Sequence, residues 1–118
     1  MAKVEPIIVT DNDTGKSYTL EFSRDSVTKA EDDCFTLQDI GKYPSKLYDL
    51  WFYSFQMHHS RAFMTRELTR KKTDEMLDAI GGVMDAPEGL WERLGELYVN
   101  AYKTLEDGSK NERVTVKL

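Results

Sequence analysis

The segment LYDLWFYSFQMHH, residues 47–59, constrains the fold of this chain more than any other part of the sequence. Its apolar residues recur at the i, i+3, i+4, i+7 spacing of one helical face, which holds Leu47, Leu50, Trp51, Ser54, Phe55 and His58. Tyr48 and Phe52 widen this face, and a helix that is apolar on most of its circumference needs partners on several sides. Because aromatic side chains bury large areas, we expect this helix, running to Phe63 or Met64, to supply most of the core.

Length and charge set the class of protein. A chain of 118 residues suits one domain, residues 1–118, with a core that needs no metal or disulfide. The net charge of -5 argues against general nucleic-acid binding. Cys34 is the single cysteine, which fits a reducing compartment. The start of the sequence lacks the apolar segment of a signal peptide, so we expect a cytoplasmic protein without membrane spans.

The N-terminal part predicts a β-hairpin over about residues 6–22. Pro6–Thr10 is rich in β-branched residues, and a turn signal, Asp11–Gly15, follows it. Tyr18, Leu20 and Phe22 then alternate with polar residues, which predicts one covered face. Since an isolated hairpin is marginal in water, we expect this one to pack on helices.

The residues after the hairpin predict helices over about residues 24–105. Ser23 is the expected N-cap of a helix from Arg24 to about Asp33, with Val27, Ala30 and Cys34 facing inward. Phe35, Leu37 and Ile40 bury a connecting turn, in which Thr36 and Asp39 suggest one short helical turn that Gly41 ends.

Two further helices are expected after the aromatic one. Ser60–Lys72 either extends the aromatic helix or forms an exposed connection, and Thr73 is the expected cap of a helix with Met76, Leu77 and Ile80 inward, ended by Gly81-Gly82. Asp85-Ala86-Pro87-Glu88 predicts the start of the last helix, which packs on the aromatic one through Leu90, Trp91, Leu94, Leu97, Tyr98, Ala101, Tyr102 and Leu105. Gly108 closes it.

In the tail, residues 109–118, Val114, Val116 and Leu118 alternate, which fits either a third strand or a mobile tail that orders on a partner.

The predicted fold class is therefore α+β. An N-terminal β-hairpin packs on a mainly helical bundle of about four helices, with a possible C-terminal strand.

The sequence carries no legible catalytic or metal signature. His58 and His59 are adjacent, so a regular helix points them about 100° apart and they cannot bind one metal together. The acidic turn at Asp11 lacks the glutamate of a calcium loop, since Phe22 stands at the twelfth position. We expect no cofactor and no metal.

A basic segment lies in the middle of this acidic chain. Arg61, Arg66, Arg70, Lys71 and Lys72 stand against one acid, Glu67. One interpretation is a small nucleic-acid-binding or regulatory protein that uses residues 61–72. The favoured interpretation is contact with an acidic protein surface, because Asp74, Glu75, Glu88 and Glu92 on the neighbouring helices would repel phosphates.

The order of these segments resembles a known group of proteins. Asn12-Asp13-Thr14-Gly15-Lys16 leads into Tyr18-Thr19-Leu20-Glu21-Phe22, then a short helix with Val27 and Glu31, and Phe35-Thr36-Leu37-Gln38-Asp39-Ile40. Phe52-Tyr53-Ser54-Phe55 and His58-His59, the Thr73 helix with its glycine pair, and the Leu90–Leu105 helix follow. This pattern resembles short uncharacterised proteins of Gram-positive phages and prophages. It is also similar to the small tail assembly chaperones encoded between the tail tube and tape measure genes.

The resemblance implies a non-enzymatic role in the bacterial host cytoplasm. Such chaperones coat the long, apolar, helical tape measure protein before the tube polymerises round it, and they self-associate. The implied partners are the tape measure or another tail protein and further copies of the chain, without membrane or nucleic acid.

The expected interaction residues are aromatic and basic: Trp51, Phe52, Phe55, Trp91, Tyr98, Tyr102, Arg66, Arg70 and Lys71. The alternative for the aromatic residues is that two adjoining helices simply bury one another.

Overall fold

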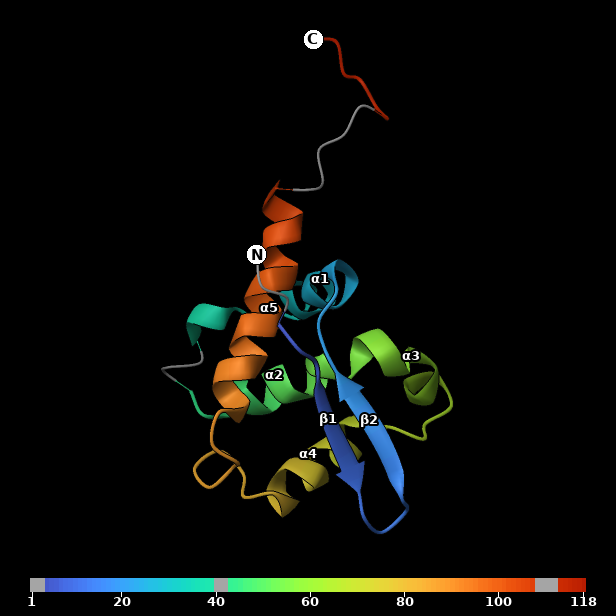
Figure 1. The fold of residues 1–118 in the computed structure, drawn as a ribbon, viewed down its shortest axis with the longest axis vertical. Coiled ribbons are helices and arrows are strands. Elements are labelled where there is room, and N and C mark those ends of the chain that lie inside the picture. Colours follow the sequence, from blue (N-terminus) through green and yellow to red (C-terminus); the bar gives the residue numbers. More distant parts are fainter. Residues whose placement is uncertain (1–3, 40–42, 108–112) are drawn as a thin grey trace.

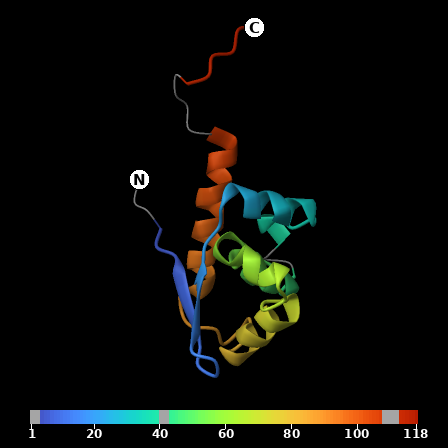
Figure 2. The same ribbon diagram turned by 90° about the vertical axis from the view of Figure 1, so that its right-hand side faces the viewer.

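A computed structural model describes residues 4–39, 43–107 and 113–118. In this part of the chain a two-stranded sheet is followed by five α-helices and a 3-10 helix. The elements are β1 (Ile7–Asp11), β2 (Lys16–Leu20), α1 (Arg24–Asp32), η1 (Leu37–Asp39), α2 (Ser45–Ser54), α3 (Gln56–Met64), α4 (Arg70–Ala79) and α5 (Leu90–Asp107). The α+β class is confirmed, with five helices in place of about four. The strands lie along one side of the cyan, green and yellow helices (Figures 1 and 2).

The hairpin forms where the sequence predicts it. β1 and β2 pair antiparallel, with Ile7 opposite Leu20 and Asp11 opposite Lys16. The Gly15 N–H donates to the Asp11 carbonyl at 2.7 Å, and Gly15 has a φ of 76°, a conformation that favours glycine. Tyr18, Leu20 and Phe22 are buried, as the alternation predicts.

Helix α1 begins at the expected cap but ends differently. The Ser23 hydroxyl accepts the Ser26 N–H at 3.2 Å, and Val27 and Ala30 are fully buried. Cys34, predicted to face inward, is exposed. Its φ of 66° turns the chain at the end of the helix, so that Phe35 and not Cys34 enters the core.

The aromatic segment is not one helix. α2 ends at Ser54 and α3 starts at Gln56, with a further non-helical residue at His59 (φ −129°, ψ 27°). The prediction of a continuous helix to Met64 is therefore wrong. The break has a physical reason: the carbonyl of Ser54 accepts the Glu21 N–H at 2.9 Å, which connects the end of the hairpin to the end of α2.

The predicted face of this segment nevertheless makes the core. Leu50, Trp51, Ser54 and Phe55 are buried and Leu47 is half-buried, but His58 is exposed because it follows the break. The Phe55 ring lies 5.3 Å from the Trp51 ring and 5.8 Å from the Tyr18 ring, so it joins α2 to the hairpin.

Helix α4 starts four residues earlier than the sequence predicts. Its N-cap is Thr69, whose hydroxyl accepts the Lys72 N–H at 3.1 Å, and not Thr73. Thr73 is fully buried inside the helix, where its hydroxyl donates to the Arg70 carbonyl. Arg70, Lys71 and Lys72 thus belong to α4 and not to a connection. The helix ends before Gly81 and Gly82, as predicted.

Helix α5 begins at Leu90 and not at the predicted Asp85–Glu88 signal. Gly89 has a φ of 85°, which is incompatible with a right-handed helix, so α5 starts only at the next residue. Of the eight α5 residues predicted to pack inward, Leu90, Leu94, Leu97, Tyr98 and Ala101 are buried and Trp91 and Leu105 are half-buried, but Tyr102 is exposed, so the prediction is wrong for Tyr102. The Tyr98 ring contacts those of Phe22 and Phe35 at 5.2 and 5.5 Å, so α5 closes the core over the hairpin and α1.

The remaining predictions from the sequence concern two helix-ending glycines and the C-terminal tail. Ile40, Gly41 and Gly108 lie outside the described residues. Residues 113–118 form no strand, and they lead away from the end of α5 (Figures 1 and 2). Val114 and Val116 are each 74% exposed, so within the described residues the alternating tail covers nothing.

Two glycines near the start of α5 should respond oppositely to replacement by alanine, as measured by the free energy of unfolding. Gly89→Ala should lower the free energy of unfolding by about 1 kcal/mol, because a left-handed φ strains any side chain. Gly95→Ala should raise it by about 0.5–1 kcal/mol, because alanine loses less conformational freedom in a helix than glycine does. A Cβ at this position meets no atom within 4 Å, so the substitution causes no clash. Urea unfolding measures both changes. Equal effects of the two substitutions would contradict this account of the helix start.

Candidate functional site

The predicted aromatic interaction residues divide between core and surface. Trp51, Phe55 and Tyr98 are at most 3% exposed, so in this fold they serve the core and offer almost no surface to a partner. Phe52 and Trp91 are half-buried, and Tyr102 is 38% exposed. Half of the predicted aromatic interaction residues are therefore core residues, as expected if adjoining helices bury one another.

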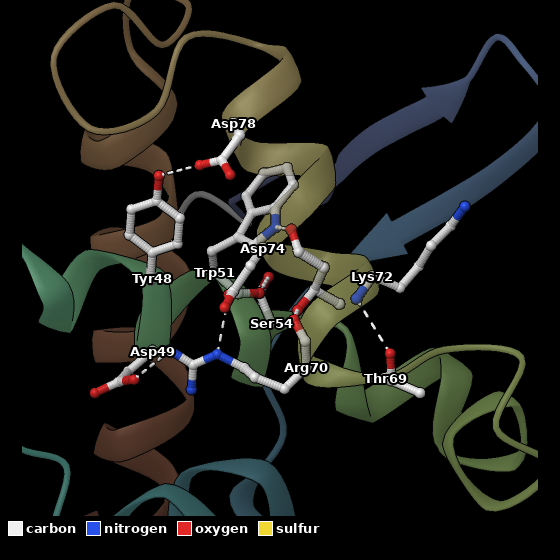
Figure 3. A network of polar contacts seen from close by, with 10 residues as sticks. Tyr48, Asp49, Trp51, Ser54, Thr69, Arg70, Lys72, Asp74 and Asp78 are labelled. Carbon is white, nitrogen blue, oxygen red and sulfur yellow. Dashed lines mark hydrogen bonds and ion pairs between the residues drawn. The ribbon is translucent and has the colours of Figure 1, made fainter.

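Trp51 also has a polar role. Its indole N–H donates to the Thr73 carbonyl at 2.7 Å, where Figure 3 shows the indole reaching from α2 to α4. A buried Trp N–H needs such a partner, and here the bond fixes the position of α4 against α2.

Arg70 is bound within the chain. Its guanidinium donates to Asp49 at 2.7 Å and to Asp74 at 2.9 Å (Figure 3). It also lies 5.1 Å from the centre of the Phe52 ring. Burial by itself lowers the pKa of Arg70, but the bonds to both carboxylates raise it above its ordinary value. Arg70 therefore joins α2 to α4, covering Phe52.

The other basic residues do not gather into one site. Lys72 pairs with Asp11 at 3.3 Å, and Lys16 of the hairpin pairs with Glu67, so ion pairs fasten the hairpin to the start of α4. Arg61, Arg66 and Lys71 have exposed side chains. A nucleic-acid site over residues 61–72 would have to compete with acidic groups of the chain itself for Arg70 and Lys72.

The two histidines support the hairpin separately. The Thr19 N–H donates to His59 Nε2 at 2.8 Å, and His58 Nε2 lies 2.8 Å from Glu21 Oε1. Burial lowers the pKa of His59, and its neighbour His58 lowers it further. Among the described residues, no group of three or more His, Cys, Asp or Glu could hold a metal ion. Nor is any described helix long and apolar enough to cross a membrane.

An apolar concavity runs along α5. One part, of about 720 Å³, lies between α5 and the first turns of α2 and is lined by Val4, Leu37, Leu47, Leu50, Trp91, Gly95, Glu96, Val99, Asn100 and Lys103. The next part, of about 360 Å³, lies between α5 and η1 and is lined by Glu31, Phe35, Thr36, Leu37, Gln38, Tyr98, Val99 and Tyr102. Leu37 and Val99 line both parts, so the two parts adjoin. We call them together the α5 groove.

The α5 groove contains three predicted interaction residues, Trp91, Tyr98 and Tyr102, and several that the sequence analysis missed. Trp91, Gly95, Val99 and Tyr102 follow one another at spacings of four, four and three, which places them on one helix face. A second apolar stripe beside the core face was therefore visible in the sequence. Leu37 was expected to be buried in a turn, and only the fold brings it to Val99.

Comparison with known proteins gives a family but no activity. The whole chain, residues 1–118, matches a domain of unknown function (DUF5055). The chain belongs to this family. No curated protein and no solved structure matches it. What this DUF5055 chain binds therefore has to be argued from its own surfaces.

The position of Arg70 gives a stability prediction. Arg70→Ala should lower the free energy of unfolding by about 1 kcal/mol, because it removes two partly exposed ion pairs and the contact with Phe52. Lys71→Ala, one residue on at an exposed position, should change it by less than about 0.5 kcal/mol. Chemical denaturation compares the two variants. Equal losses would show that Arg70 does not stabilise the contact between α2 and α4.

His59 gives a prediction on pH. Its pKa is lower in the folded state than the ordinary 6.5, so the unfolded state takes up a proton first. The contribution of His59 to stability is therefore present above pH 6.5 and is lost as the pH falls below that value. His59→Gln, which can still accept the Thr19 N–H, should make the free energy of unfolding fall less between pH 7 and pH 5. His58→Gln is the control: it removes only the smaller of the two causes that lower the pKa of His59, so it should keep most of the decrease. A full decrease in His59→Gln would refute the assignment.

Proposed function

We propose that this chain is a non-enzymatic tail assembly chaperone of a phage or prophage, which holds an apolar helical segment of the tape measure protein in the α5 groove. The observation that carries the proposal is the groove itself, an apolar stripe of α5 left outside a core that is already complete. We place the activity in the cytoplasm of the bacterial host.

The dimensions of the α5 groove suit a helix. The stripe from Trp91 to Tyr102 spans about three turns, or about 16 Å. Val99 is 36% exposed and Tyr102 is 38% exposed, while Leu37 and Leu47 on the facing wall are half-buried. An amphipathic helix binds such a groove through residues at i, i+3, i+4 and i+7.

The rim of the groove is polar and carries both signs of charge. Glu31 and Glu96 lie among its lining residues, together with Asn100 and Lys103. A polar rim around an apolar centre is the usual anatomy of a protein interface, and its charges set the register of a partner more than the affinity. The net charge of -5 favours the solubility of a holding protein while its groove is empty.

The phage setting comes from the order of segments between about Val9 and Leu105 that resembles tail assembly chaperones. A tape measure protein offers long apolar helices, which are the ligand that the α5 groove fits. The structure gives the nucleic-acid alternative no comparable support, since Arg70 and Lys72 already pair with Asp49, Asp74 and Asp11.

Binding to the tape measure protein encoded in the same genome tests the proposal. Overlapping helical fragments of that protein serve as probes, with affinity measured by calorimetry. Val99→Asp places a charge at the junction of the two parts of the groove and should weaken binding at least about tenfold. Thr104→Asp adds the same charge at an exposed position of α5 outside the groove lining and should bind like the unmodified chain.

The result that would contradict the proposal is equal binding by the two variants, or no binding of any tape measure fragment by the unmodified chain. Gene order is an independent check. A tail tube gene before this one and a tape measure gene after it is the expected arrangement.

A further inference from the structure

The two edges of the hairpin differ in how they are covered. The outer edge of β2 is closed by the helices: the Thr19 N–H donates to His59 Nε2 at 2.8 Å and the Glu21 N–H donates to the Ser54 carbonyl at 2.9 Å. These two bonds also show which residue pairs of the hairpin are hydrogen-bonded to each other and which are not. Because the Thr19 N–H points away from β1, the pair Thr19–Ile8 is not hydrogen-bonded within the sheet.

This alternation decides which backbone groups of β1 point away from β2, at the free edge of the sheet. Opposite residues of an antiparallel pair are hydrogen-bonded to each other or not at all, so Ile8 and Thr10 direct their N–H and C=O groups away from β2. No bond from another element in the described part of the chain reaches these groups. An edge strand with open donors and acceptors is a template for a further strand.

An apolar pocket lies beside this edge. It has a volume of about 430 Å³ and is lined by Ile7, Ile8, Val9, Thr10, Trp51, Ile80, Pro87, Glu88, Gly89, Leu90 and Arg93. Ile7 and Val9 lie on the covered face of β1, and Ile8, 63% exposed, lies on the other face. A strand added beside β1 would direct every second side chain into this pocket.

The C-terminal tail has the matching pattern. Val114, Val116 and Leu118 alternate with Thr115 and Lys117, and all five residues are exposed. We propose that this tail adds antiparallel to β1 of a second copy of the chain, so that two copies exchange their tails in a symmetric dimer. Thr115 then lies opposite Thr10 and Lys117 opposite Ile8, with Val116 beside Val9 and Leu118 beside Ile7. The backbones of Ile8 and Thr10 receive the partners that they lack within the sheet.

The geometry selects a second copy and not the tail of the same chain. The pocket lies at the Leu90 end of α5, whereas the tail leaves from the Asp107 end (Figure 1). α5 is about 27 Å long, and the seven Cα–Cα steps from Asp107 to Val114 span at most about 25 Å. The antiparallel register places Val114 beside Asp11, at the far end of β1, which the tail of the same chain cannot reach. The inference uses the β1 edge and does not depend on the α5 groove.

Disulfide formation between two single-cysteine chains tests the register. Both chains carry Cys34→Ser, one with Ile8→Cys and the other, with a mass tag, with Lys117→Cys. The expected result after mild oxidation is a disulfide-linked heterodimer, because opposite residues lie about 5.5 Å apart, within disulfide reach. The control replaces Ile8→Cys by Asp25→Cys on α1, an exposed position outside the pocket, and should give no such heterodimer.

The oligomeric state of full-length variants gives the second measurement. Val116→Asp should weaken dimerisation at least about tenfold in light scattering, since it places a charge in the pocket. Thr115→Asp, which keeps the charge on the outer face, should leave the dimer intact. Absence of the Ile8–Lys117 disulfide would overturn the proposal, as would equal dimerisation by the two variants. A monomeric unmodified chain at high concentration would overturn it as well.

Discussion

Trp51 is completely buried, and its indole N–H is donated to the carbonyl of Thr73 at 2.7 Å. Its ring also contacts Phe55, which in turn contacts Tyr18 of the hairpin. One side chain thus connects α2 with α4 and, through Phe55, with β2. The break between α2 and α3 belongs to the same arrangement, because it frees the Ser54 carbonyl to accept the Glu21 N–H. The hairpin, which would be marginal alone, depends on these contacts.

Local patterns in the sequence were sufficient for the hairpin, the cap at Ser23 and the core face of α5. Each rests on residues near one another in the chain, such as the alternation of Tyr18, Leu20 and Phe22. The break at Phe55 could not be predicted, since its cause is a bond to Glu21, more than thirty residues earlier. The same holds for Thr73, whose buried place in α4 depends on Trp51.

The candidate site was predicted only in part, for a related reason. An aromatic side chain suits a core and an interface equally well, so composition could not separate Trp51 and Tyr98 from Tyr102. The fold separates them, because the core takes the rings that face several elements at once. What remains for binding is the second stripe of α5, where Val99 and Gly95 accompany Trp91 and Tyr102. Arg70 was likewise predicted to contact a partner but is used within the fold, since its acidic partners Asp49 and Asp74 belong to its own chain.

The α5 groove and the β1 edge offer two surfaces with different uses. The groove is apolar with a polar rim and suits a helix, whereas the β1 edge offers backbone groups and suits a strand. A dimer joined at the β1 edges would leave both α5 grooves open, since the lining of the pocket beside β1 and the lining of the α5 groove share no residue. One protein could in this way present two helix-binding grooves to one long partner, which increases avidity without any new contact.

The most direct test of the binding surface is the amide NMR spectrum of the isotope-labelled chain during titration with a helical tape measure fragment. This account predicts chemical-shift changes concentrated at Leu37, Leu47, Gly95, Val99 and Tyr102, with the amides of Arg61, Arg66 and Lys71 unchanged. Changes concentrated at residues 61–72, with the α5 groove unaffected, would contradict it.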